Sequence, residues 1–122
     1  MLDIIFIILV LLFVKHWYID FVNQTADEVQ WKGTYLKWAG IKHSLKHGIG
    51  TSLILWICGI ASIDAIMLGV LDFVIHYHID WTKININKKN NYTPQDKQFW
   101  LWLGADQLAH SLTYLFIVWC LF

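Results

Sequence analysis

The sequence contains no arginine, one proline and two cysteines, and each scarcity argues against a class of protein. Nucleic-acid-binding domains usually carry a basic stripe, which a formal net charge of zero without arginine does not favour. One proline and seven glycines in 122 residues exclude a disordered or collagen-like chain. Cys58 and Cys120 lie far apart in apolar runs, so neither a disulfide framework nor a CxxC metal motif is present.

Charged residues are also scarce. They make up 15% of the chain, against about 25% in ordinary soluble domains. Hydrophobic residues make up 57%, and the mean hydropathy is +0.49. The length predicts a single domain over residues 1–122. The first apolar run is not typical of a secretory signal, because Asp3 precedes it and no small-residue cleavage site follows.

Four apolar segments approach the length of about 20 residues that a helix needs to cross a bilayer. The predicted spans are residues 2–24, 41–57, 60–82 and 94–121. Only Cys58 and Gly59 separate the second and third spans, which predicts a tight antiparallel hairpin. Because lipid leaves only helices or closed barrels, we expect an all-α fold, an integral membrane four-helix bundle.

The lysines predict the orientation of this bundle. Eight of the nine lie in or beside the first and third connections, and the second connection and both termini have none: Lys32, Lys37, Lys42, Lys46, Lys83, Lys88, Lys89 and Lys97. By the positive-inside rule, the first and third connections face the cytoplasm. We therefore expect an inner (cytoplasmic) membrane protein with both termini outside.

Both lysine-rich connections contain local structural signals. Trp31, Tyr35 and Trp38 recur at helical spacing, which suits either a helix over about residues 28–39 in the headgroup region or a loop with interfacial aromatics. In the third connection, a hydroxyl N-cap at Thr93 precedes Pro94, with an acid at Asp96. This pattern predicts that the last helix begins near Pro94.

Each predicted span carries one pair of histidine or aspartate residues at i, i+4 spacing, which places both side chains on one helical face. The pairs are His16 with Asp20, His43 with His47, His76 with Asp80, and Asp106 with His110. Two ligands so placed can hold one metal ion, as in zinc-binding HExxH helices. At about 1.5 Å per residue, all eight fall in one layer roughly 18–30 Å from the outer helix ends.

Ionisable groups inside a span indicate a functional site by default. A metal site is favoured here over a proton or ion relay, and over a polar network that only holds the helices together. Eight donors exceed what one ion accepts, which favours two ions. Mixed nitrogen and oxygen ligands suit Zn, Mn or Fe, with Zn the first choice for redox-silent chemistry.

Three further polar residues lie in the third span. Asp72 extends the His76 and Asp80 stripe, and could be a ninth ligand or a carboxylate that orients a ligating histidine. Asp64 lies near the outer end, where we expect it to be solvated. His78 lies off the His76 face, so we expect an interfacial side chain rather than a ligand.

Three motifs carry a family resemblance: His16 to Gln24 (HWYIDFVNQ), His76 to Lys83 (HYHIDWTK) and Asp106 to His110 (DQLAH). In this order they resemble a family of small bacterial and phage membrane proteins, domain-of-unknown-function family 3307. The resemblance covers nearly the whole chain and implies that Gln24, Lys83 and Gln107 also belong to the site. More distantly, the pattern is similar to membrane-bound metal-dependent hydrolases, a group linked to zinc phospholipase C-like and nuclease-like enzymes.

These patterns predict a metal-dependent hydrolase that acts on a phosphoester or lipid-linked substrate at the cytoplasmic face. Asp80 or Asp72 would accept a proton from the attacking water, and Lys83 would neutralise charge on the substrate. The alternative is a non-catalytic membrane metal-binding, ion-transport or scaffold protein. The expected partners are membrane lipid and either a second copy or another membrane protein, with no nucleic acid.

Overall fold

A computed structural model describes all residues, 1–122, and every regular element in it is helical. The prediction of an all-α fold is confirmed. In chain order the elements are α1 (Leu2–Trp17), a π-helical turn η1 (Tyr18–Val22), α2 (Ala26–Trp31), α3 (Trp38–Ile57), α4 (Ser62–Asn90) and α5 (Lys97–Leu121).

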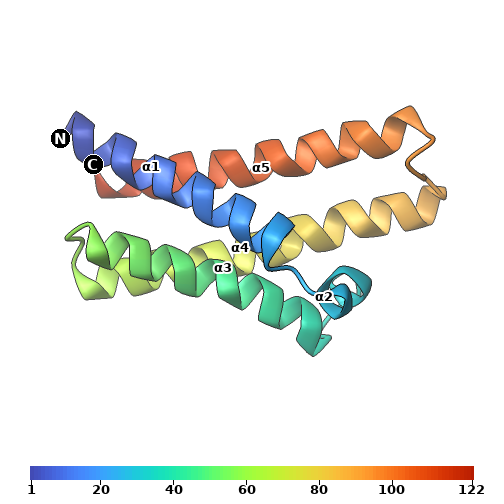
Figure 1. Ribbon diagram of the computed structural model, residues 1–122, viewed down its shortest axis with the longest axis horizontal. Helices are drawn as coiled ribbons and strands as arrows, with labels where there is room; N and C mark the ends of the chain where they lie inside the picture. The colour runs from blue at the N-terminus through green and yellow to red at the C-terminus, as the bar shows by residue number, and fades with distance from the viewer.

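The four long helices run antiparallel to their neighbours in sequence (Figure 1). Both termini and the α3–α4 turn lie at one end of the molecule, which we call the terminal end. The short helix α2 and the α4–α5 turn lie towards the other end, the α2 end. The lysine-rich connections therefore lie together, away from the termini.

Glycines allow α3 and α4 to form a tight hairpin. Gly59, at φ +88°, closes the turn by letting the Ile60 N–H donate to Leu55 O at 3.0 Å. Further along, a Cβ on Gly48 would lie 2.7 Å from Gly69 O, and a Cβ on Gly69 would lie 2.6 Å from Gly48 O. Only glycine permits this backbone approach.

The α4–α5 connection differs from the prediction. Helix α4 does not end near residue 82 but continues to Asn90, so that its 29 residues span about 44 Å. Its last turns and the start of α5 project beyond α2 (Figure 1). The last helix begins at Lys97 rather than Pro94, because the Asp96 N–H donates to Thr93 O at 2.8 Å and closes a turn there.

Of the two alternatives for the first connection, a helix over about residues 28–39 or a loop, neither describes it fully, because a shorter and earlier helix is followed by a turn. Thr25 caps α2 in a reciprocal capping box with Glu28. The helix ends at Trp31, and the chain then turns through Gly33, which packs against Ile84 of α4, and Leu36, at φ 62°. Tyr35 lies in this turn, and Trp38 begins α3.

Two of the helices are long and apolar enough to cross a membrane: Leu2–Val22, which joins α1 to η1, and Ser62–Asn90. The predicted bundle of four spans is thus not confirmed. Helix α3 is less apolar because Lys42 and Lys46 lie in its first turns, and the polar residues of α5 lower its hydropathy.

Side chains are distributed with polar groups inside and apolar groups outside. The buried set contains ten hydrophobic and fifteen polar or charged residues. Large apolar side chains such as Phe6, Val10 and Trp17 are more than half exposed. The buried apolar side chains gather mainly towards the terminal end, around Leu12 and Ile117. The polar core occupies the half of the bundle nearer α2.

Candidate metal centre

All four long helices, together with η1, contribute to one buried cluster of histidine and aspartate side chains. Its eight members form three neighbouring groups, each with its candidate ligand atoms within 4.8 Å of one another. The groups are Asp20, His43, His47 and His76; then His16, His76 and His110; then Asp80, Asp106 and His110. These are the eight residues that the i, i+4 pairs single out. The structure brings all of them together.

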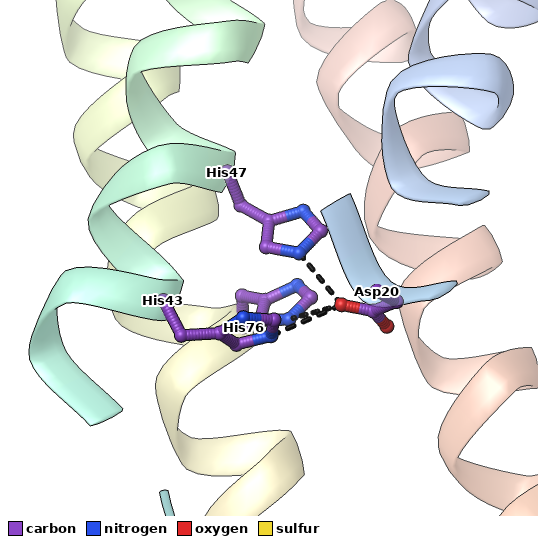
Figure 2. A group of neighbouring side chains, drawn as sticks. All are labelled: Asp20, His43, His47 and His76. Atoms are coloured by element: carbon purple, nitrogen blue, oxygen red, sulfur yellow. Dashed lines mark hydrogen bonds and ion pairs between the residues drawn. The ribbon is translucent and has the colours of Figure 1, made fainter. Parts of the chain in front are cut away.

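The first group is centred on Asp20 (Figure 2). Its Oδ1 atom lies 2.8 Å from His47 Nε2, 3.0 Å from His43 Nε2 and 3.7 Å from His76 Nε2. Ligands about 2.1 Å from one ion in a tetrahedron lie about 3.4 Å apart. The separations in this group lie on both sides of that value, so a small shift of side chains would accommodate an ion.

Asp80 connects the first group to the other two. Its Oδ2 lies 3.4 Å from both His43 Nε2 and His76 Nε2, whereas its Oδ1 lies 3.2 Å from His110 Nε2. His110 Nε2 is in turn 3.6 Å from Asp106 Oδ2. The two oxygens of the Asp80 carboxylate thus face histidines of different groups.

The π-helical turn positions Asp20. Isolated π turns within helices are often found at functional sites, because the wider turn redirects a side chain. Here the turn Tyr18–Val22 follows α1 without a break and buries Asp20, whose Oδ2 lies 3.2 Å from His16 Nε2. The i, i+4 spacing therefore predicted a real proximity, although the local backbone is not α-helical.

The ring orientations fit metal ligation. The Nδ1 atoms of His16 and His43 contact Tyr114 OH at 3.0 Å and Glu28 Oε2 at 3.3 Å, so that both Nε2 atoms face the cluster. A ligating histidine typically uses its second nitrogen in this way. His76 is fully buried and makes no hydrogen bond through either ring nitrogen. Buried ring nitrogens that make no hydrogen bond are costly, and a metal ion would remove part of that cost.

Glu28 is a neighbour of the cluster that the sequence reasoning missed. It is fully buried, and besides His43 it contacts Lys46 Nζ at 2.6 Å through Oε1. Burial raises the pKa of Glu28, but the hydrogen bonds from Lys46 and from the Thr25 backbone outweigh this effect and hold the pKa below the usual 4.5. Helix α2 thus places an ionised carboxylate beside His43 Nδ1, the ring nitrogen that faces away from the cluster.

The residues implied by the family resemblance surround the cluster. Gln24 donates to Asp20 O and accepts from Lys32, whose Nζ lies 3.4 Å from Asp80 Oδ2. Gln107 contacts both His16 Nε2, at 3.1 Å, and Asp106 Oδ2, at 3.0 Å. On the other side, Lys83 Nζ lies 3.4 Å from Asp106 Oδ1.

Asp72 lies in none of the three groups. Its Oδ2 accepts from Lys15 Nζ at 2.8 Å and from the Thr51 hydroxyl at 2.6 Å. Lys15 Nζ also donates to His47 O at 3.1 Å, so this ion pair borders the cluster on the side of the apolar core. Lys15 was also missed, because it follows an unbroken apolar run and has no partner at i, i+4. His78 is exposed and contacts Tyr35 instead of the cluster.

These features define the class: a helical protein with a buried histidine–aspartate centre assembled from all of its long helices. The chain belongs to the family described as "Protein of unknown function (DUF3307)", whose model matches residues 8–122. Comparisons with curated proteins and with solved structures give no match.

Proposed function

We propose that this protein is a membrane-embedded metal-dependent hydrolase that acts on a phosphoester or lipid-linked substrate at the cytoplasmic face. One observation carries the proposal. Five histidine Nε2 atoms and three carboxylates converge in a buried cluster, and His76 has no hydrogen-bond partner there. A network that served only to join helices would satisfy its members with one another.

Placement in a membrane is supported by the distribution of side chains. Two helices have the length and composition of spans, and large apolar side chains cover the outside of the bundle. Although α3 carries more charge, Lys42 and Lys46 lie near its α2 end and contact Glu28 at 3.5 Å and 2.6 Å. We infer that α3 and α5 complete a four-helix bundle with the α2 end at the cytoplasmic surface.

The donor set supports a divalent ion such as Zn, with Mn or Fe as alternatives. Asp20, His43, His47 and His76 would hold one ion. The other two groups add His16, Asp80, Asp106 and His110, which offer a place for a second ion. Asp80 contacts His43 of the first region and His110 of the second.

A bound divalent ion would supply a water of lowered pKa and polarise a phosphoryl oxygen. This chain's own residues would then orient the reaction. Asp80 is the better candidate than Asp72 to accept a proton, since Asp72 is held by Lys15 and Thr51. Lys83 and Lys32 lie beside Asp106 and Asp80, where each could contact an anionic substrate.

A non-catalytic metal-binding, ion-transport or scaffold protein is the second candidate, and the burial of the cluster favours the metal-binding form. None of its eight residues is more than 8% exposed, and closed sites with only protein ligands are typical of structural metals. Ion transport is less favoured, because the apolar cluster around Leu12, Leu55 and Ile117 fills the terminal end of the bundle.

Metal analysis of the purified protein tests the proposal, with two matched variants on one helix. We expect stoichiometric transition metal in the wild-type protein and in His78→Ala, and a clear loss in His76→Ala. Release of phosphate or headgroup from a lipid panel should then disappear in Asp80→Asn while the fold is kept. Absence of metal from the wild-type protein would refute the proposal. Full metal without turnover would favour the non-catalytic candidate.

Orientation requires a separate experiment. Single cysteines introduced at Lys37 and Lys88, in a background without Cys58 and Cys120, should react with a membrane-impermeant thiol reagent only after the inside of the cell or vesicle is opened. Labelling of either position from outside intact cells would contradict the proposed topology.

A further inference from the structure

A cleft of about 490 Å³ lies between α4 and α5, on the outside of the bundle. This volume is within the roughly 300–1,000 Å³ of ligand-binding pockets. Most of the lining is apolar, and Asp106, a member of the candidate metal centre, also lines it. The cleft thus connects the buried cluster to the lateral surface, which faces lipid in the proposed bundle.

The polar residues that line the cleft, apart from His78, lie towards one end. Thr82, Lys83 and Asp106 lie towards the α2 end together with Trp102 and Ala105, whereas Val74 and Ile75 lie towards the terminal end. Along α4, the nine residues from Val74 to Thr82 cover about 12 Å. This polarity matches the direction of a membrane lipid, whose headgroup lies at the surface and whose chain points towards the bilayer centre.

Ala105 and Ala109 lie one turn apart on α5, with Asp106 between them in sequence, and leave room for a lipid to approach. The α4 side of the cleft is apolar from Val74 to Ile79 except for one residue. His78 is the polar residue here, but its Nδ1 contacts Val74 O at 2.7 Å and its Nε2 contacts Tyr35 OH at 3.1 Å. A hydrocarbon chain could therefore lie along this part of the cleft without leaving a ring nitrogen of His78 unpaired.

We propose that the α4–α5 cleft binds one acyl chain of a phosphate-bearing membrane lipid and presents its headgroup to Lys83 beside the metal centre. This inference rests on the proposed function, because it assumes a membrane and an ion that engages Asp106. Once Asp106 ligates an ion, Lys83 can exchange Asp106 Oδ1, now 3.4 Å away, for a phosphate oxygen. The acyl chain makes the site selective for a lipid over free phosphate.

Native mass spectrometry of the metal-loaded protein in detergent tests the cleft, with phosphatidic acid, diacylglycerol and inorganic phosphate as separate probes. Phosphatidic acid should bind best. Diacylglycerol has the chains without the phosphate, and inorganic phosphate has the charge without the chains. Tight binding of inorganic phosphate alone would show a free-anion site and overturn the lipid assignment.

Two variants test the acyl-chain contact and the headgroup contact separately. Ala105→Leu with Ala109→Leu should fill the cleft and weaken phosphatidic acid binding about tenfold, the loss expected when about two methylene groups of the chain stay unburied. Lys83→Gln should abolish the preference for phosphatidic acid over diacylglycerol. Gly104→Leu is the matched control, because a Cβ there meets no atom within 4 Å. It should bind lipid as the wild-type protein does.

Metal content is measured on the same samples, so that the two proposals can fail separately. Intact metal with equal phosphatidic acid binding in all variants would overturn the cleft assignment and leave the metal centre standing. Absence of metal from every sample, together with lipid binding that still depends on Ala105 and Ala109, would overturn the metal proposal and keep the cleft.

Discussion

Replacement of Glu28 by alanine should weaken metal binding without removing any proposed ligand. Glu28 is fully buried, and its Oε2 lies 3.3 Å from His43 Nδ1. Loss of such a partner typically lowers metal affinity about 10–100-fold, or about 1.4–2.7 kcal/mol. The variant also leaves the buried His43 Nδ1 unpaired, which should lower stability by about 1–3 kcal/mol.

Two companion variants separate orientation of His43 from stability of α2. Thr25→Ala removes the hydroxyl that caps α2 at the Glu28 N–H, at 3.2 Å, which should lower stability by about 0.5–2 kcal/mol and leave metal affinity unchanged. Glu28→Gln keeps an oxygen that can accept from His43, so most of the affinity should return.

The assays are competition with a chelator of known affinity and thermal unfolding in the same detergent. Equal metal affinity in Glu28→Ala and in the wild-type protein would refute the orienting role. An equal loss in Thr25→Ala would show that α2 acts only as a folded unit and that the Glu28 carboxylate has no specific effect on His43.

Three further outcomes are expected. Lys15→Met should destabilise the fold by about 3–5 kcal/mol because it leaves the charge of the buried Asp72 uncompensated. Adding Asp72→Asn should recover most of that loss. A double variant that unfolds thermally at as low a temperature as Lys15→Met alone would contradict this. Gly69→Ala should lower the free energy of unfolding by about 1–3 kcal/mol, since its Cβ would lie 2.6 Å from Gly48 O, whereas Gly104→Ala should not be destabilising. Removal of metal by a chelator should lower the melting temperature, and re-addition should restore it; no change would count against a buried metal.

The candidate ligands could be predicted from sequence because their signal is local. An i, i+4 pair such as His76 and Asp80 identifies its own helical face, and four such pairs on four helices require a common interior. Glu28 has no such periodic partner and lies in a connection. The sequence did contain one signal for Glu28. It follows Thr25 by three residues, which is a capping-box pattern that predicts the start of α2.

Other features depend on contacts between distant segments and have no local signal. Lys15 and Asp72 are 57 positions apart, and neither indicates the other in the sequence. Lys32 was considered only as a charge that sets orientation, yet its Nζ lies 3.4 Å from Asp80 Oδ2. The extension of α4 to Asn90 was missed because a hydropathy argument ends a helix where the lipid ends, although its backbone can continue into water.

The charges around the cluster bear on how many ions it holds. Asp20, Asp80 and Asp106 carry three negative charges, and Lys32 and Lys83, each 3.4 Å from one of these carboxylates, offset two of them. One divalent ion would leave the buried site with a net charge of about +1, whereas two would leave about +3, which is unfavourable in a medium of low dielectric constant. An anion bound beside Lys83 would reduce that excess charge.

The second ion should therefore bind more tightly when phosphatidic acid is present. Metal titrations followed by native mass spectrometry should show one ion without the lipid and two with it, whereas diacylglycerol should leave the count at one. Two ions bound at full occupancy in lipid-free, anion-free protein would refute this link between charge and occupancy.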